Sequence, residues 1–362
     1  MKHSPLHARH LARNAKMADF GGWLMPIDYP DTGTLVEHAA VRERVGLFDV
    51  SHLGKASVKG QDALGFLNGA FTNDLNRIID GEAQYTMMCD EAGGVIDDLI
   101  VYRNSSDDFF LVPNASNTSD VVGGLKALSH PGMEIRNLHE GYGVLALQGP
   151  NSIDVLRALG VNPDIDYMSF SRTSIAGAPV ILCRTGYTGE HGYEILPTWS
   201  EAEKVWDAIV DAMKSFDGVV CGLGARDTLR TEMGYPLHGH ELSLDITPVQ
   251  ASANWAVGWT KARFTGSEIL RKEREDGPVR RLVGLRCLGR GIPRAHMEVK
   301  NSAGEKIGEV TSGTFSPTLK NGIALALIAP GHSLGDHLSI DVRGKACEVE
   351  IVKLPFVPSH VR

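Results

Sequence analysis

The sequence predicts an α+β fold. Apolar side chains recur at helical spacing over residues 201–215 (EAEKVWDAIVDAMKS), whereas residues 94–102 and 179–184 have the apolar, β-branched character of short strands. Helical and strand patterns do not alternate regularly, and no repeat of roughly 20 to 50 residues occurs. Regular alternation is typical of a doubly wound parallel sheet, so its absence favours α+β.

Further elements follow from the same two patterns. Residues 109–112 and 144–147 are expected as strands, and residues 225–233 as a helix after the Gly222-Leu223-Gly224 loop. Residues 271–281 (RKEREDGPVRR) are a run of mixed charges that contains Gly277-Pro278. Such a run predicts a solvated helix end followed by a linker.

After this linker the pattern changes to short strands separated by glycine turns. The expected strands are residues 282–285, 307–311, 323–328, 338–342 and 347–352. Strands at roughly ten-residue spacing are typical of a small barrel or sandwich. We therefore expect a β-domain at 280–362.

Length and charge restrict the class of protein. The chain has 362 residues, with 36 Lys and Arg against 44 Asp and Glu, which gives a formal net charge of −8. At roughly 150 residues per domain, this length predicts two or three domains. The acidic balance argues against nucleic acid as the main partner, because a phosphate backbone favours a basic face.

Cysteine usage and hydropathy indicate a compartment. The five cysteines are odd in number, widely spaced and without a C-x-x-C pair, which excludes a disulfide framework and a zinc site of the usual spacing. The N-terminus is polar and lacks the apolar core of a signal peptide, and no apolar run is long enough to cross a bilayer. We expect a cytoplasmic protein with reduced cysteines and no membrane partner.

The first candidate site is residues 93–102 (GGVIDDLIVY), a glycine turn followed by a strand. Side chains alternate along a strand, so Asp97 and Asp98 point to opposite faces and cannot share a proton. Both faces are otherwise mostly apolar, so at least one carboxylate is expected in a partly buried place, where such groups are paired or functional. The alternative is a strand-start Asp that bonds backbone amides near the turn.

The second candidate is residues 184–195 (RTGYTGEHGYEI), where Gly186, Gly189 and Gly192 predict a tight loop that enters a strand. No Gly-Lys-Ser/Thr follows, so this loop is not a P-loop. Glu194 stands in an otherwise apolar strand start. It is either a functional carboxylate or an exposed residue of a hairpin.

The third candidate is residues 222–232 (GLGARDTLRTE). Arg226 falls in the first turn of the expected helix, where a cation opposes the helix dipole. We expect it to serve an anion or a carbonyl outside the helix, with a local salt bridge as the alternative. Arg226 and Arg230 share one helix face and repel mildly unless partners intervene.

Other patterns are discounted. His238-x-His240 would need further ligands that the sequence does not indicate, so we expect no metal. Trp255 and Trp259, four residues apart, indicate core packing rather than ligand stacking. No G-x-G-x-x-G opens a βαβ unit, so a dinucleotide-binding domain is not expected.

The ordered set of motifs resembles the glycine cleavage system T-protein family over nearly the whole chain. The matching segments are residues 19–26 (DFGGWLMP), 47–52 (LFDVSH), 94–101 (GVIDDLIV), 147–150 (LQGP), 184–195, 222–230, 311–318 (TSGTFSPT) and 355–358 (PFVP). The resemblance implies a three-domain cloverleaf with tetrahydrofolate in a central channel. Domain one would be residues 1–48 and 137–262, with domain two, residues 49–136, inserted in it, and the barrel at 280–362 would be the third.

The resemblance also implies an activity. Members of this family transfer the methylene carbon of an aminomethyl group, carried on the lipoyl arm of H-protein, to tetrahydrofolate. The products are 5,10-methylenetetrahydrofolate, ammonia and dihydrolipoyl H-protein. The cofactor would be tetrahydrofolate as co-substrate, without a metal, and the partner would be lipoylated H-protein.

Site residues carry over position by position. Asp98 matches the catalytic carboxylate, expected to orient the folate nitrogens and to stabilise positive charge as ammonia leaves. Glu194 matches the residue that bonds the pterin ring, and Arg226 matches the Arg that donates to the ring carbonyl or braces Glu194. Further lining positions match Tyr187, Asn114 and Tyr235. The loop glycines Gly186 and Gly189 would let the backbone approach the ligand.

Two departures and two rival functions accompany the resemblance. Many members have Leu-Tyr-Gly where this chain has Leu237-His238-Gly239. Many also end in a Tyr-containing tail, whereas the tail here is Ser359-His360-Val361-Arg362. One rival is a folate-dependent demethylase of an S- or N-methyl substrate. The other is a non-catalytic folate-binding relative, whose Lys-Gly-Cys motif is absent here.

Overall fold

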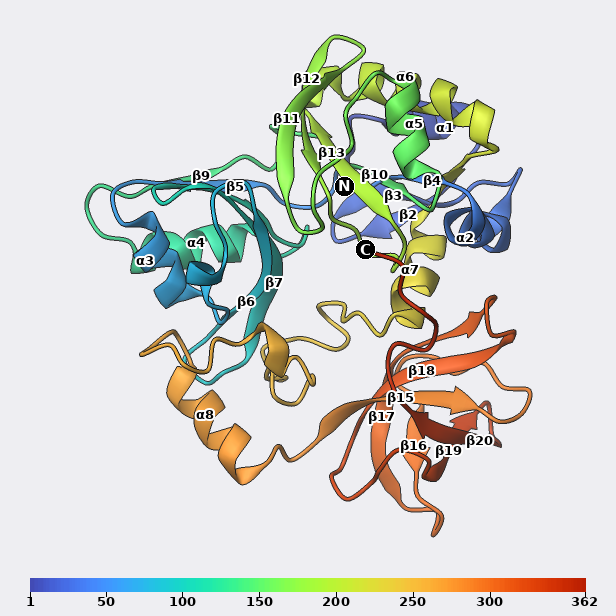
Figure 1. Ribbon diagram of the computed structural model, residues 1–362. Helices are drawn as coiled ribbons and strands as arrows, with labels where there is room; N and C mark the ends of the chain where they lie inside the picture. Colours follow the sequence, from blue (N-terminus) through green and yellow to red (C-terminus); the bar gives the residue numbers. More distant parts are fainter.

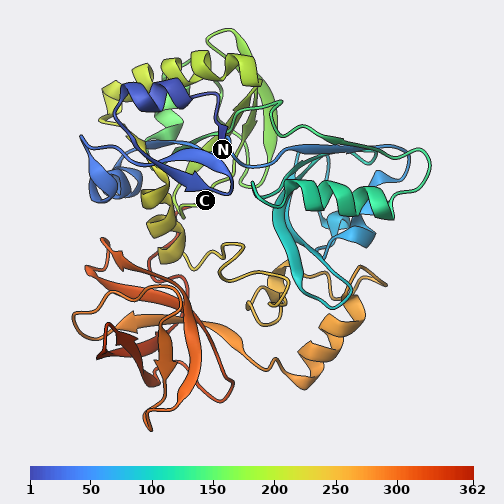
Figure 2. The same ribbon diagram turned by 180° about the vertical axis from the view of Figure 1, so that it is seen from behind.

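The computed structural model describes residues 1–362 and arranges them as three bodies around a central region (Figure 1). A mixed body containing both chain ends lies at the top of Figure 1, a sheet-and-helix body at the left and a β-barrel at the lower right. The view from behind shows the same three lobes (Figure 2). No helix combines the length and apolar character that crossing a membrane requires.

The first body contains a six-stranded and a three-stranded sheet. The six strands, in spatial order, are β11 (Phe170–Ile175), β12 (Ala178–Cys183), β13 (Gly192–Pro197), β10 (Leu145–Gln148), β4 (Gly46–Asp49) and β14 (Val219–Cys221). The smaller sheet has the order β1 (Lys2–His3), β3 (Trp23–Asp28), β2 (Lys16–Phe20). The helices of this body are α1 (His7–Ala12), α2 (Gly33–Glu43), α5 (Ser152–Ala158), α6 (Ala202–Met213) and α7 (Leu223–Glu232).

The helical pattern predicted over residues 201–215 is confirmed as α6, which is flanked by the 3₁₀ turns η2 (Trp199–Glu201) and η3 (Lys214–Phe216). Its apolar stripe, Val205, Trp206 and Ile209, is fully buried in the core of the six-stranded sheet. The helix expected at 225–233 is α7, which packs against α2, β3 and β17 of the barrel.

The second body is an insertion. Its sheet has the order β6 (Ala83–Cys89), β7 (Val95–Ser105), β8 (Asp108–Val112), β5 (Ala56–Lys59), β9 (Glu134–Asn137). It is covered by α3 (Ala63–Ala70) and α4 (Thr118–Leu128), with the turn η1 (Leu75–Arg77). The whole body lies in sequence between β4 and β10, which pair directly in the first body with Leu47 opposite Leu147. The strand patterns did not indicate this insertion.

The C-terminal body is a closed barrel with the order β15 (Arg281–Cys287), β18 (Asn321–Ile328), β17 (Lys306–Ser316), β16 (Glu298–Lys300), β19 (His337–Val342), β20 (Lys345–Val352). Five of these strands were predicted, and the barrel interpretation is confirmed. The sixth, β16, has only three residues and closes the barrel between β17 and β19.

The first six residues of the charged run before the barrel form the second half of α8 (Ser267–Asp276), and the helix is followed by Gly277. Gly277 has φ +87°, a conformation that favours glycine and stops the helix. Leu270 of α8 joins a core cluster that also contains Met87 of β6 and Leu325 of β18. This cluster fastens the barrel to the second body.

Candidate active site

One cavity of about 730 Å³ collects the residues that the sequence singled out. Its lining includes Asp98, Asn114, Tyr187, Glu194, Arg226 and Tyr235. Asp98 and Asn114 come from the second body, and the other four come from the first body and the chain that follows α7. All six predicted site residues therefore meet at one place in the fold.

Asp98 lies on β7 with both carboxylate oxygens held. Oδ2 accepts a hydrogen bond from the Tyr85 hydroxyl at 3.0 Å, and Oδ1 accepts one from Nδ2 of Asn114 at 2.9 Å. Burial, followed by the charge of Asp97, raises the pKa of Asp98 above its ordinary value. Asp98 bonds no backbone amide, so the alternative of a turn-capping aspartate is wrong for this residue.

Asp97 lies on the opposite face of β7, as strand alternation predicted, and is fully buried. Its Oδ1 accepts from Nδ2 of Asn117 at 2.7 Å and from Nδ2 of Asn114 at 2.9 Å, and its Oδ2 accepts from the Asn114 backbone N–H at 2.9 Å. Burial raises the pKa of Asp97 as well. Asn114 thus bonds both carboxylates and fixes one relative to the other.

Glu194 lies on β13 in the interior of the six-stranded sheet and is 9% exposed. The alternative of an exposed hairpin residue is therefore wrong. Its Oε2 accepts a hydrogen bond of 2.5 Å from Thr185 Oγ1, which also lies 3.2 Å from the Tyr102 hydroxyl. Oε1 makes no hydrogen bond within the chain, which leaves one carboxylate oxygen for a ligand.

Arg226 lies in the first turn of α7, as predicted. Its guanidinium stacks over the Tyr187 ring at 4.7 Å from the ring centroid, and its buried Nη1 has no hydrogen-bond partner. It forms no ion pair, so the alternative of a local salt bridge is wrong. Burial lowers the pKa of Arg226, and the nearby charge of Glu194 opposes that effect. A buried N–H without an acceptor is costly, and this one remains available to an acceptor from outside the chain.

The neighbouring Arg230 is fully paired. It donates to Glu241 at 2.9 Å, to Ser312 Oγ of the barrel at 2.8 Å and to Asp227 at 2.8 Å. These partners relieve the repulsion from Arg226 that the sequence predicted. Tyr187 and Tyr235 stack at 5.7 Å between ring centroids, and the Tyr187 hydroxyl donates to the Pro236 carbonyl.

The structure gives the loop glycines a packing reason in addition to the expected approach to a ligand. A Cβ on Gly186 would lie 2.1 Å from Oε1 of Gln148, and Gly189 has φ +80° and faces Met233. Packing against the protein itself is therefore a sufficient reason for glycine at both positions. Only Gly186 also lines the cavity.

Sequence reasoning missed several aromatic residues of the cavity wall, among them Trp255 and Tyr85. Trp255, on the 3₁₀ turn η4 (Asn254–Ala256), is 63% exposed, lines the cavity and stacks on Tyr85 at 5.0 Å. The expectation that Trp255 packs in the core is wrong, because residues 254–259 do not form the helix that the spacing assumed. Tyr85 carried no signal beyond strand alternation.

The two histidines after α7 each lie within hydrogen-bond distance of a backbone carbonyl. His238 Nε2 lies 3.0 Å from the Val95 carbonyl, and His240 Nδ1 lies 2.8 Å from the Thr311 carbonyl. No group of three or more His, Cys, Asp and Glu side chains with metal-binding geometry occurs. All five cysteines are buried and unpaired.

Comparison with known proteins agrees with this geometry. Residues 6–261 match the family model described as the GCVT N-terminal domain, and residues 280–358 match the glycine cleavage T-protein C-terminal barrel domain. The chain belongs to the glycine cleavage T-protein family. Both the resemblance drawn from the motifs and the α+β fold with a C-terminal barrel are confirmed.

Relatives of this T-protein family cover the full chain. An aminomethyltransferase of Parafrankia sp. (strain EAN1pec) is 54% identical over 100% of this chain and 99% of its own length. One of Mycobacterium tuberculosis is 56% identical over 99% and 98%. The crystal structure of glycine cleavage system aminomethyltransferase T from Bartonella henselae superposes with a TM-score of 0.93 at 32% identity, covering 99% of each chain. The chain is an enzyme, an aminomethyltransferase.

Proposed function

We propose that this aminomethyltransferase takes an aminomethyl group from the lipoyl arm of an H-protein and passes its methylene carbon to tetrahydrofolate. Ammonia and the dihydrolipoyl carrier would be the other products. One observation carries the proposal: Asp98, Glu194 and Arg226 line the same cavity, where Nη1 of Arg226 has no partner and the Glu194 carboxylate is bonded only through Oε2.

Glu194 and Arg226 suit the pterin end of a folate. A carboxylate accepts two parallel N–H bonds from an amino-substituted ring, and the unpaired Arg226 Nη1 donates to a ring carbonyl beside it. The stacked pair of Tyr187 and Tyr235 supplies a flat wall. A cavity of about 730 Å³ lies within the range that holds ligands of this size.

Asp98 suits the reacting end. When tetrahydrofolate is bound, its nitrogens accept the methylene carbon. The Asp98 carboxylate, fixed by Tyr85 and Asn114, would orient those nitrogens and stabilise the positive charge that develops as ammonia leaves. Fixed dipoles around the carboxylate reduce the reorganisation needed during the reaction.

The barrel offers a docking surface for the carrier. A second cavity of about 540 Å³ is lined by Arg290, Arg294, Lys320 and Arg343 and by no acidic residue. Arg294 donates at 2.9 Å to the Gly313 carbonyl on β17, two residues from Thr311, which bonds His240 of the first cavity. We propose that this basic groove receives an acidic carrier and that the lipoyl arm reaches the first cavity from there.

The remaining expectations are proposals of the same kind. We propose domain boundaries at 1–48 with 137–262, at 49–136 and at 280–362, which the pairing of β4 with β10 across the inserted sheet supports. We also propose a cytoplasmic location, which five unpaired buried cysteines support.

The test is ammonia release. Purified protein mixed with aminomethylated lipoyl H-protein and tetrahydrofolate should release ammonia and form 5,10-methylenetetrahydrofolate. An Asp98→Asn variant should bind tetrahydrofolate as well as the wild type and turn over at least roughly 100-fold more slowly. Absence of ammonia with a carrier that a known aminomethyltransferase accepts would refute the proposed function.

A further inference from the structure

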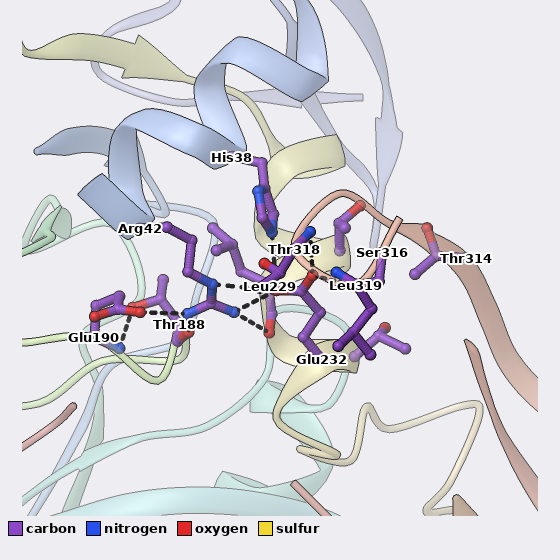
Figure 3. A network of polar contacts seen from close by, with 12 residues as sticks. His38, Arg42, Thr188, Glu190, Leu229, Glu232, Thr314, Ser316, Thr318 and Leu319 are labelled. Carbon is purple, nitrogen blue, oxygen red and sulfur yellow. Dashed lines mark hydrogen bonds and ion pairs between the residues drawn. The ribbon is translucent and has the colours of Figure 1, made fainter. Parts of the chain in front are cut away.

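Glu232, the last residue of α7, is a fully buried carboxylate outside the cavity. Its charge opposes the dipole at the C-terminal end of a helix, so it does not stabilise α7 by itself. It accepts hydrogen bonds from His38 Nε2 at 2.9 Å, from Arg42 Nη2 at 2.6 Å and from Ser316 Oγ of the barrel (Figure 3). Burial alone would raise the pKa of Glu232, but these partners lower it to about 2.

Arg42 extends this contact to the loop between β12 and β13. Its Nη1 donates to the Thr188 carbonyl at 2.6 Å and to Glu190 at 2.9 Å, while the other arm of the guanidinium holds Glu232 (Figure 3). Glu190 in turn lies 3.0 Å from Nδ1 of His360 in the C-terminal tail. We call His38, Arg42, Glu190, Glu232 and Ser316 the Glu232 network.

The elements joined by this network carry several residues of the cavity wall. Arg226 and Arg230 project from α7, and Tyr187 projects from the loop that Arg42 holds. No member of the Glu232 network lines the cavity itself. Asp98 lies on β7 of the second body, and its hydrogen-bond partners, Tyr85 and Asn114, are not members of the network.

We propose that the Glu232 network is a positioning device that fixes α7 and the 184–190 loop relative to each other and to the barrel, and so sets the affinity for tetrahydrofolate. This inference rests on the proposed function. The guanidinium of Arg226, whose Nη1 has no partner, lies over the Tyr187 ring only when helix and loop keep their relative placement. Arg42 is suited to this task because a rigid guanidinium bonds several acceptors at once.

The network supports the side of the cavity that carries Arg226 and Tyr187, and not the side that carries Asp98. Disturbing the network should therefore affect folate binding and the transfer rate differently. Loosening it disturbs Arg226 and Tyr187 and leaves Asp98 with its partners Tyr85 and Asn114. Folate binding should therefore weaken while the rate of transfer at saturating folate is kept. A purely structural role would instead lower the fraction of active protein, which reduces kcat and leaves KM unchanged.

The test uses Glu232→Gln, which keeps the side-chain volume and removes the charge. We expect the Kd for tetrahydrofolate by calorimetry, and the KM for it in the ammonia assay, to rise about tenfold with kcat within about twofold of wild type. The matched control is Glu273→Gln, because Glu273 bonds Thr247 at 2.6 Å and Gln250 at 2.9 Å away from the cavity. This control should leave both constants unchanged.

Two further variants keep the test decisive if Glu232→Gln does not fold. Ser316→Ala removes only the barrel hydroxyl, and Arg42→Lys removes the rigid fork. Each should raise KM for tetrahydrofolate by about threefold or more with kcat retained. A lowered kcat with unchanged KM in all folded variants would overturn the inference. Wild type that binds no tetrahydrofolate would refute the proposed function instead.

Discussion

Replacing Asp97 by asparagine should move the ionisation of Asp98 toward lower pH. Each carboxylate accepts a hydrogen bond of 2.9 Å from Nδ2 of Asn114, so the accepting oxygens lie less than ~6 Å apart. Burial is the first cause of the raised pKa of Asp98, and the charge of Asp97 is the second. Asp97→Asn removes the second cause and keeps the first.

The size of the effect follows from the separation. Two like charges ~6 Å apart, at an effective dielectric constant of about 20, repel by about 3 kcal/mol, and one pKa unit corresponds to about 1.4 kcal/mol. A full charge on Asp97 would therefore account for about two units. Burial raises the pKa of Asp97 too, and the two neighbouring carboxylates titrate together, so we expect a shift of at least about one unit.

The assay is the pH dependence of ammonia release at saturating substrates, from about pH 5 to about pH 9. If ionised Asp98 is required, the wild-type rate falls as pH drops through its raised pKa. The falling limb of Asp97→Asn should lie about one unit lower. Glu91→Gln, which removes an exposed charge before the same strand, should leave the profile in place. An unmoved limb in Asp97→Asn, or one displaced to higher pH, would refute the electrostatic reasoning.

Three more predictions concern binding and stability. Glu194→Ala should weaken tetrahydrofolate binding by about 10- to 100-fold in calorimetry, because charge-assisted hydrogen bonds to a ring edge are lost, and an unchanged Kd would contradict the pterin role. Arg294→Glu should raise the KM for the carrier, most strongly at low salt, without changing the Kd for tetrahydrofolate, and an equal effect on both would argue against the groove as the docking surface. Although burial opposes its charge, bonds from His10 at 2.8 Å and Ser4 at 2.5 Å lower the pKa of Asp49 from 3.8 to about 2. The stability it contributes, about 2 kcal/mol, is present above about pH 4 and is lost as pH falls toward 2, so urea unfolding of wild type and Asp49→Asn should differ at pH 7 and converge at low pH.

Features set by local sequence could be predicted. The apolar stripe of α6 and the short barrel strands each arise from neighbouring residues, so the periodicity located them. β16 escaped because a strand of three residues has no measurable alternation. The strand patterns did not predict the insertion because it depends on which distant strands pair, and the composition of β4 and β10 does not determine that pairing.

The candidate site divides in the same way. Strand alternation placed Asp97 and Asp98 on opposite faces, and the helix dipole identified Arg226 as a cation that needs an outside partner. The bridge made by Asn114 between the two carboxylates depends on how β7 and the loop after β8 come together, so spacing did not show it. Trp255 was misplaced because its exposure at the cavity is set by the irregular path of the chain after α7.

The direct pairing of β4 with β10 has a consequence for how the chain is made. Leu47 meets its neighbour Leu147 only after the ribosome has synthesised the inserted body, a delay of ~5 to 20 s at typical synthesis rates. β14, which pairs with the other edge of β4, emerges later still. All strands of the inserted sheet are synthesised before β10, so this sheet can fold while β4 still lacks both of its partner strands. During synthesis, the N-terminal half of the first body is therefore the last part of residues 1–221 to be completed, and its unpaired strand is the segment that needs protection from aggregation.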